Sequence, residues 1–457
     1  MTPIAGTSVL TAAQMRAAED AAIAAGASVA TLMQAAGAGI ADAVRRLAGV
    51  NDVLILCGPG NNGGDGYVAA ARLHAAGRKV RVAAASEPRS SAAIAARALW
   101  TGAVEPLDSA APDAVLVDAL FGTGLSRALD TVFSSALNRL AAQANIAIAV
   151  DVPSGVSTDN GRLLGDVPTF DVTLALGAVK PAHLLQPAAA RCGAVRVIPI
   201  GVETDSTTRV LARPDFSAPP VDAHKFTRGM VAVIRGRMAG AAELAARAAM
   251  HAGAGYVELL GATIPGTPHA LVRRRCDEAA LADKRIGALL IGPGLGRDDN
   301  ARALLDQALA TDHPLVIDGD ALHLVTPEHL RTRTAPLLLT PHAGEFAALF
   351  GAPTGSKLDA ARAAAERAGA TIVFKGSDTV IAAPDGQAVL VGEASSWLST
   401  AGTGDVLAGA IAAMLAGGRT PLEAAAAGVW LHGEAARRLG PAFIADDLAT
   451  ALTGARA

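Results

Sequence analysis

Toward its C-terminal end the chain reads Ser399-Thr400-Ala401-Gly402-Thr403-Gly404-Asp405-Val406-Leu407-Ala408-Gly409, and an apolar helical pattern follows. Gly402 and Gly404 have no Cβ, so their backbone can approach a ligand closely. The amides that open the next helix are unpaired and form an anion site. Asp405 would repel a phosphate, so we predict that it is a base for a hydroxyl beside a phosphoryl group. The simpler alternative is that Asp405 only caps the helix.

The composition indicates a globular, core-forming chain. Its 457 residues suggest two to three domains, and 51% of them are hydrophobic while the net charge is −3. The sequence contains no long run of Lys and Arg residues, so it does not predict nucleic-acid binding. Cys57, Cys192 and Cys276 lie far apart, which indicates reduced thiols rather than a zinc site. No apolar run reaches the length of a membrane span, so we expect a cytoplasmic protein with no membrane partner.

A glycine-rich motif follows the first expected strand. The apolar residues Val53 to Cys57 precede GPGNNGGDG, Gly58 to Gly66, and a helix is expected from Tyr67 to Ala76. Strand, glycine loop and helix together are the context in which such a motif binds phosphate. Asparagine and aspartate side chains in the motif add hydrogen-bonding groups. The alternative is an ordinary turn between a strand and a helix.

Two later expected strands also end in polar, glycine-bearing loops. Ala114 to Asp118 is followed by the loop Phe121 to Leu125, and Ile146 to Val150 is followed by Asp151 and Ser154. The carboxyl ends of parallel strands share one edge of a sheet, so we expect these side chains to converge. Their oxygens could hold a hard cation. The alternative is that Asp118 and Asp151 merely cap the loops that follow them.

The βα pattern breaks between residues 201 and 223 and then restarts. Prolines and low periodicity predict a linker, so we expect one domain over 1–212, a linker over 213–223 and a second domain over 224–457. Four strands of the second domain are expected to lead into polar or glycine-bearing segments. These segments are, in order, Gly292–Gly296, the pair Asp318 and Asp320, the pair His342 and Glu345, and Lys375–Thr379.

Three residues of these strand ends suggest nucleotide chemistry. Lys375 is of a type that binds phosphate, although an exposed surface lysine is the alternative. His342 lies in a loop, which favours a ligand contact over a core position. Glu345 could belong to the same site or could be only an acid in the first turn of a helix.

Together these motifs identify a family resemblance. The first half resembles NAD(P)H-hydrate epimerase domains in LTAAQMRAAE, GPGNNGGDG, VDALFGTGL and VDVPSGV. The second half resembles ADP-dependent NAD(P)H-hydrate dehydratase domains in GAAELAARAAMHAGAGYVEL, IGPGLG, VIDGDAL, TPHAGEFAAL, KGSDTVIA and TAGTGDVLAG. These motifs follow the family's order and cover nearly the whole chain. The resemblance implies two three-layer α/β domains, an N-terminal Rossmann-like epimerase fold and a C-terminal ribokinase-like fold.

The resemblance also implies site residues. In the first half, the substrate-binding positions are Asn61, Asn62, Gly63, Gly64, Asp65, Gly122, Thr123, Gly124, Leu125, Ser126, Arg127, Ala128 and Asp151, and a potassium site matches Asn62, Asp118 and Ser154. In the second half, Ala242, Gly294, His342 and Asp405 match hydrate-binding positions, and Lys375, Gly376, Ser377, Asp378, Thr379 and Gly404 match the ADP site. Phosphoryl chemistry implies Mg²⁺, with Glu345, Asp318 and Asp320 as candidate ligands.

The chain departs from the family pattern at four places. Lys225 is followed by Phe226-Thr227-Arg228-Gly229 instead of glycine, and Arg235 replaces a common glycine. His323 replaces a frequent asparagine, and Ser395-Ser396-Trp397 stands where Asn-x-Gly is usual. All four departures concern the dehydratase half.

The function that the resemblance implies is the repair of hydrated nicotinamide nucleotides. The first half would interconvert the R and S hydrates with Asp151 as acid/base. The second half would dehydrate the S form with Asp405 as base, converting ADP to AMP and phosphate. The expected partners are NADHX or NADPHX and ADP, in a homo-oligomer. The alternatives are a ribokinase-type small-molecule kinase and an N-terminal half that only senses nucleotides.

Overall fold

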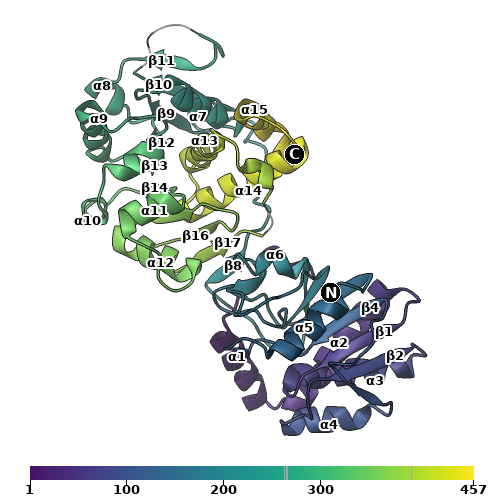
Figure 1. The fold of residues 1–457 in the computed structure, drawn as a ribbon. Coiled ribbons are helices and arrows are strands. Elements are labelled where there is room, and N and C mark those ends of the chain that lie inside the picture. The colour runs from purple at the N-terminus through teal and green to yellow at the C-terminus, as the bar shows by residue number, and fades with distance from the viewer. Residues whose placement is uncertain (262, 264–265, 393) are drawn as a thin grey trace. The chain divides into compact units, whose positions relative to one another are not determined.

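The computed structural model describes residues 1–261, 263, 266–392 and 394–457. Two compact units divide the chain, Met1–Val210 and Leu211–Ala457 (Figure 1). Residues 213–223, where the sequence predicts a linker, fall in the second unit. There Phe216 packs on Trp430, with ring centroids 5.7 Å apart.

The first unit is built on one parallel sheet with the strand order β3-β2-β1-β4-β5-β6-β7. The strands are β1 (Val53–Cys57), β2 (Val80–Ala84), β3 (Val104–Pro106), β4 (Val115–Ala119), β5 (Ile146–Val150), β6 (Val172–Leu176) and β7 (Ala194–Ile198), and β8 (Thr208–Val210) ends the unit. The chain runs outward from β1 in one direction and then returns to place β4 on its other side. The carboxyl ends of β1 and β4 therefore flank the crevice at which open α/β sheets bind ligands.

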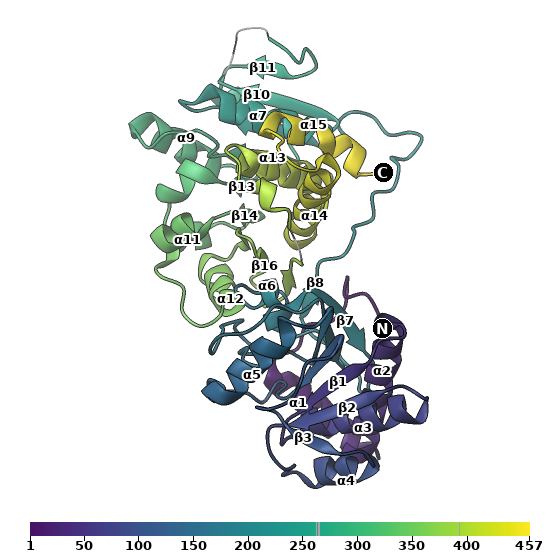
Figure 2. The same ribbon diagram turned by 45° about the vertical axis from the view of Figure 1, so that its right-hand side comes forward.

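Helices cover both faces of this sheet (Figures 1 and 2). They are α1 (Ala12–Ala24), α2 (Val29–Ala48), α3 (Asn61–Ala75), α4 (Ser91–Leu99), α5 (Thr131–Ala141) and α6 (Ala189–Cys192), with a 3₁₀ turn, η1 (Pro181–His183). Alternate residues of β1 enter two cores: Ile55 packs with residues of α2 and α3, whereas Leu54 packs with residues of α5. Burial on both faces explains why the parallel strands read as continuous apolar runs.

The glycine motif differs from the sequence-based expectation in one respect. The helix begins at Asn61 rather than at Tyr67, so the residues Asn61 to Asp65 form its first turn and not a loop. The motif's glycines provide room for close packing instead. A Cβ on Gly63 would lie 1.9 Å from the carbonyl oxygen of Gly58, and one on Gly64 would lie 2.6 Å from Met33 Cε.

The second unit has a longer sheet with the strand order β11-β10-β9-β12-β13-β14-β15-β16-β17. Its strands are β9 (Met230–Ile234), β10 (Tyr256–Leu260), β11 (Val272–Arg274), β12 (Ala288–Ile291), β13 (Leu315–Ile317), β14 (Leu337–Leu339), β15 (Thr371–Phe374), β16 (Val380–Ala382) and β17 (Ala388–Leu390). Pairing is parallel from β11 to β15, and β16 and β17 add antiparallel strands at one end.

Helices again pack on both faces of the sheet (Figure 1). They are α7 (Ala239–His251), α8 (Glu278–Leu281), α9 (Asp299–Leu309), α10 (Pro327–Arg331), α11 (Ala343–Phe350), α12 (Lys357–Ala368), α13 (Thr403–Ala416), α14 (Pro421–Leu439) and α15 (Ala445–Ala455), with 3₁₀ turns η2 (Gly319–His323) and η3 (Ser396–Leu398). The apolar helix α13 is almost wholly buried between α7 and α14. The predicted fold class, two α/β domains with helices on both faces of each sheet, is confirmed.

Among the described residues, no single helix is long and apolar enough to cross a membrane. Only α1 and α2 taken together pass the same test of length and composition, as a pair bent by 118°.

The packing of α13 on α7 yields a stability prediction. A Cβ on Gly409 would lie 2.1 Å from the carbonyl oxygen of Ala245, so the Gly409→Ala substitution should force the two helices apart. We expect it to lower the free energy of unfolding by about 1–3 kcal/mol. Gly433→Ala in α14 is the matched control, because its Cβ would meet open space and should stabilise by about 0.5–1 kcal/mol.

Urea unfolding followed by tryptophan fluorescence tests this prediction. A Trp100→Phe background confines the signal to Trp397 and Trp430 of the second unit. If the Gly409→Ala protein is as stable as its parent, the close approach of Gly409 to the carbonyl of Ala245 is contradicted.

Candidate functional site

The first candidate site surrounds Asp151, directly after β5. Asp151 has a φ of +66°, an unusual value for a residue with a side chain. Its Oδ1 lies 2.5 Å from the Nζ atom of Lys180, and its Oδ2 accepts a 3.0 Å hydrogen bond from the amide of Thr123. Asp151 therefore does not merely cap its own loop. It joins the loop after β4 to a buried cation supplied by the segment after β6.

Lys180 and His183 belong to this site, although the sequence analysis did not identify them. Lys180 is 1% exposed and also donates to the carbonyl of Leu176. His183 Nδ1 accepts from the amide of Lys180, so its Nε2 carries the proton and donates to the carbonyl of Asp151 over 2.7 Å. A lysine shortly after an expected parallel strand shares the edge with the other strand ends, which was the available signal.

The acidic groups of this site have opposite pKa shifts. Burial alone would raise the pKa of Asp151, but the Lys180 ammonium outweighs burial and holds that pKa below its usual range. Burial, with the Asp151 charge nearby, raises the pKa of Asp65 well above its usual range and also raises the pKa of Glu19. Burial lowers the pKa of His183 to about 4, so its ring is neutral. Such divergent environments are typical of acid and base partners.

Asp118 and Ser154 meet as the potassium hypothesis requires. Ser154 donates from Oγ and from its amide to the Asp118 carboxylate, over 2.8 and 2.9 Å. These hydrogen bonds act to lower the pKa of Asp118, but burial outweighs them and raises it to about 6. The Asn62 Nδ2 is buried without a hydrogen-bond partner among the described residues. An unpaired N–H donor calls for an acceptor from a ligand, such as a phosphate oxygen. The oxygens of Asp118 and Ser154 are of the type that a hard cation binds.

The other predicted residues of the first site differ in placement. Gly122 lies against the carboxylate of Asp151 and the carboxamide of Asn62. A Cβ on Gly122 would be 2.8 Å from Asp151 Oδ2 and 3.2 Å from Asn62 Oδ1. Asn61 accepts a hydrogen bond from Ser90. The loop residues 126–128 are exposed to solvent.

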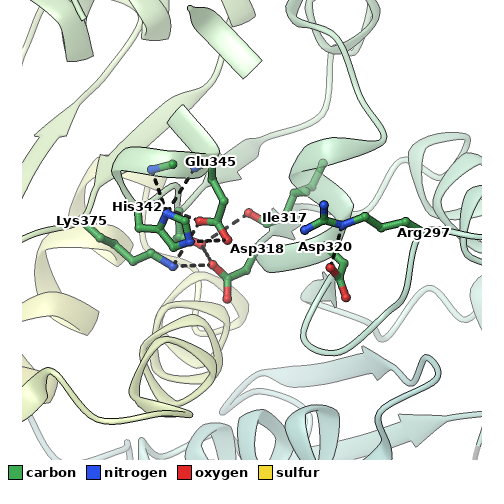
Figure 3. A network of polar contacts seen from close by, with 9 residues as sticks. Arg297, Ile317, Asp318, Asp320, His342, Glu345 and Lys375 are labelled. Atoms are coloured by element: carbon green, nitrogen blue, oxygen red, sulfur yellow. Dashed lines mark hydrogen bonds and ion pairs between the residues drawn. The ribbon is translucent and has the colours of Figure 1, made fainter. Parts of the chain in front are cut away.

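The second candidate site centres on Lys375, which follows β15. Its Nζ lies 2.8 Å from Asp318 Oδ1 and 3.9 Å from Glu345 Oε2 (Figure 3). A Cβ on Gly404 would lie 3.5 Å from the same nitrogen. Burial acts to lower the pKa of Lys375, but the carboxylates outweigh burial and the pKa is raised. The structure thus brings together strand ends that lie far apart in the sequence, and Lys375 is not an exposed surface lysine.

His342 and Glu345 form the start of α11. His342 is exposed, and its Nδ1 accepts from the amides of Gly344 and Glu345. Glu345 is buried, and its Oε2 accepts from the amide of His342. The histidine is therefore a helix cap at the surface of the site and not a core residue (Figure 3).

Asp405 lies in the first turn of α13. No side chain within the described chain caps this helix; Gly402, with a φ of +87°, is the capping residue. The simpler reading of Asp405 as a cap is therefore wrong. Burial first, and then the charges of Asp318, Asp320 and Glu345 against that of Lys375, raise the pKa of Asp405 to about 7. A carboxyl with this pKa is well matched to general-base chemistry near neutral pH.

The remaining predicted contacts lie on either side of this cluster. Gly294, with a φ of +58°, accepts from the amide of Met238 just before α7, and Ala242 is buried within α7. In the loop after Lys375, Asp378 pairs with Lys357 over 2.7 Å, and Thr379 donates to the carbonyl of Gly376.

The departures from the family pattern have separate positions. His323 is exposed at the end of η2, and Trp397 is exposed in η3. Lys225 lies over the rings of Phe226 and Tyr256. Arg235 follows β9 and lines a cavity described below.

The charge of the second site suits a divalent cation bound together with phosphate. The charges of Asp318, Asp320 and Glu345 all act on Asp405. Asp318 pairs with Lys375, whereas Asp320 pairs with Arg297 over 3.0 Å (Figure 3). Within the described ranges, no three His, Cys, Asp or Glu side chains are grouped to hold a metal by themselves. Mg²⁺ commonly takes one or two carboxylates and completes its shell with substrate phosphates and water.

Comparison with known proteins agrees with the two-unit division. A family described as YjeF-related protein N-terminus matches residues 29–182, and one described as NAD(P)H-hydrate dehydratase matches residues 231–455. A bifunctional NAD(P)H-hydrate repair enzyme from Thermofilum pendens is 35% identical over 88% of this chain and 86% of its own length. Its counterpart from Mycobacterium tuberculosis is 37% identical over 82% of this chain and 80% of its own length.

A solved structure resembles part of the chain. The ADP/ATP-dependent NAD(P)H-hydrate dehydratase from Bacillus subtilis, co-crystallised with ATP and Mg²⁺, is 31% identical, covering 52% of this chain and 92% of that one with a TM-score of 0.47. The sequence relatives, matched over most of both chains, decide the assignment. The chain belongs to the family of bifunctional NAD(P)H-hydrate repair enzymes.

Proposed function

We propose that the chain epimerises R and S NAD(P)H hydrates in its first unit and dehydrates the S hydrate in its second, at the expense of ADP. The observation that carries the proposal is Asp405, a carboxyl with a pKa of about 7 in the first turn of a buried helix. Family membership favours hydrate repair over a ribokinase-type kinase with a nucleotide-sensing module.

In the dehydratase unit, Asp405 takes the proton from the C6 hydroxyl of the hydrate. The hydroxyl oxygen then attacks the terminal phosphoryl group of ADP, and AMP leaves. Backbone amides in the first turn of α13 would hold the transferring phosphoryl group. Phosphate departs from C6 as the ring loses a proton and regains its double bond, which restores NADH or NADPH. Phosphate is a far better leaving group than hydroxide.

The other residues of this site position the reactants. Lys375 lies close enough to Gly404 to contact the same phosphates, and residues 375–379 with Gly404 would bind ADP. His342, Gly294 and Ala242 would contact the hydrate. Mg²⁺ would be held by the phosphates with Glu345, Asp318 or Asp320 and would neutralise developing charge. The solved relative that was crystallised with ATP and Mg²⁺ leaves ATP open as an alternative donor.

In the epimerase unit, we assign opposite roles to two buried acids. Asp65, kept protonated by burial, would give a proton to the departing C6 hydroxyl. Asp151, kept ionised by Lys180, would take a proton from the water that returns to the other face. The first turn of α3 and the loop from Gly122 to Ala128 would bind the nucleotide. Oxygens of Asn62, Asp118 and Ser154 would hold K⁺ and fix the loop after β4.

We further propose a cytoplasmic homo-oligomer whose partners are NADHX or NADPHX and ADP. Neither nucleic acid nor membrane is required by this chemistry.

The role of Asp405 yields a kinetic prediction. Asp405→Asn should lower kcat for dehydration by about 10²-fold or more, because the base is lost, while the affinity for ADP changes little. In the wild type, kcat/KM should rise as the pH rises through about 7, where Asp405 loses its proton. The variant should lose that rise.

Steady-state kinetics on purified S hydrate, with ADP affinity from calorimetry, provide the measurement. Asp306→Asn, which removes an exposed carboxylate from α9, is the control. Unchanged turnover in Asp405→Asn would refute the assigned role.

The buried Lys180–Asp151 pair yields a stability prediction. Lys180→Met leaves a buried carboxylate without its cation and should cost about 3–5 kcal/mol at neutral pH. A carboxyl with a lowered pKa stabilises the fold above its unfolded pKa and loses this effect as the pH falls. The deficit of the variant should therefore shrink in acid.

Urea unfolding followed through Trp100, with Trp397 and Trp430 replaced by Phe, reports on the first unit. Lys79→Met is the control, since Lys79 is exposed and its 3.8 Å pair with Asp52 should contribute less than about 1 kcal/mol. Equal losses in the two variants would contradict the buried ion pair.

A further inference from the structure

A basic cavity lies beside the dehydratase site, at the carboxyl ends of β11, β10, β9 and β12. Its volume is about 630 Å³, within the range of ligand pockets. The lining includes three arginines, Arg235, Arg237 and Arg275, and one acidic residue, Asp298. Three positive charges against one negative charge leave a net charge of +2. The Asp298 carboxylate already caps α9 through the amide of Ala301.

The three guanidinium groups are available to a ligand. None of them forms a salt bridge with any residue that the structure describes. Arg235 is half-buried; one terminal nitrogen donates to the carbonyl of Gly261, while its Nε is buried with no partner among the described residues. A buried donor without an acceptor is costly, so its presence points to an acceptor supplied by a ligand.

The cavity is linked to the reaction site by the loop after β12, at the same edge of the sheet. Leu295 lines the cavity, and the amide of the next residue, Gly296, donates to Asp320 over 3.0 Å. Asp320 in turn acts on the charge of Asp405. The helix α13, which carries Asp405, packs on β9, β12 and β13, and Arg235 directly follows β9. An extended dinucleotide with its nicotinamide at Asp405 would therefore place its adenosine end toward the arginines.

We propose that Arg235, Arg237 and Arg275 bind the 2′-phosphate of the hydrate of NADPH, which makes NADPHX the preferred substrate of this dehydratase. The inference rests on the proposed function for the identity of the hydrate. A phosphate monoester carries about −1.5 to −2 charges at neutral pH and matches the net charge of the cavity. Guanidinium groups bind phosphate in a bidentate manner, and arginine accommodates the 2′-phosphate in other NADP sites.

Binding of two adenine nucleotides to the full chain tests the proposal without relying on turnover. Adenosine 2′,5′-bisphosphate should bind about ten-fold more tightly than 5′-AMP by calorimetry. Arg235→Gln and Arg275→Gln should each remove most of that difference and leave the affinity for 5′-AMP within about two-fold. Arg302→Gln is the control, because Arg302 is an exposed arginine of α9 outside the cavity lining.

Kinetics provide the second measurement. The ratio of kcat/KM for S-NADPHX to that for S-NADHX should fall about ten-fold in Arg235→Gln. Equal affinity of the wild type for the two nucleotides would overturn the proposal. A variant that weakens both nucleotides or both hydrates alike would also overturn it, because the arginines would then contact a phosphate that both share. If the bisphosphate binds as expected while neither hydrate turns over, the 2′-phosphate site stands and the proposed function fails.

Discussion

Parallel strand pairing is the constraint on which both candidate sites depend. When strands run in one direction, all their carboxyl ends lie at one edge, and backbone pairing fixes which ends are neighbours. Asp151 can meet Lys180 because β5 pairs with β6, and Lys375 can meet Asp318 because β13, β14 and β15 are consecutive in the sheet. The chemistry of each site thus follows from the strand order more than from proximity in the sequence.

The two sites use buried charge in opposite ways. In the first unit a fully buried ammonium keeps Asp151 ionised, while Asp65 nearby has its pKa raised by burial. In the second unit the Lys375 ammonium pairs with Asp318 and lies 3.9 Å from Glu345, and the charges of both carboxylates also act on Asp405. Asp405, in the first turn of α13, has its pKa raised to about 7. In the proposed roles, the first arrangement would separate an acid from a base, and the second would make one base responsive near neutral pH.

Much of this arrangement could be predicted from the sequence, and the exceptions have physical causes. Strands such as Val53–Cys57 and strand-end acids such as Asp118 were visible because apolar runs and glycine-bearing loops are local signals. The start of α3 at Asn61 was missed because the motif's glycines indicate a loop, whereas they serve close packing. Lys180 was missed because its place after an expected strand is a weak signal, and its pairing with Asp151 depends on contact across the sheet.

The most direct test of the account is repair of a mixed hydrate pool by one chain. An epimer mixture of NADH hydrate is incubated with the purified protein, Mg²⁺ and ADP, and the near-ultraviolet absorbance of NADH is followed. The account predicts full recovery by the wild type, and by Asp151→Asn only a fast phase limited to the S share. No recovery with either ADP or ATP, or identical full recovery by Asp151→Asn, would contradict the claim that both units are active.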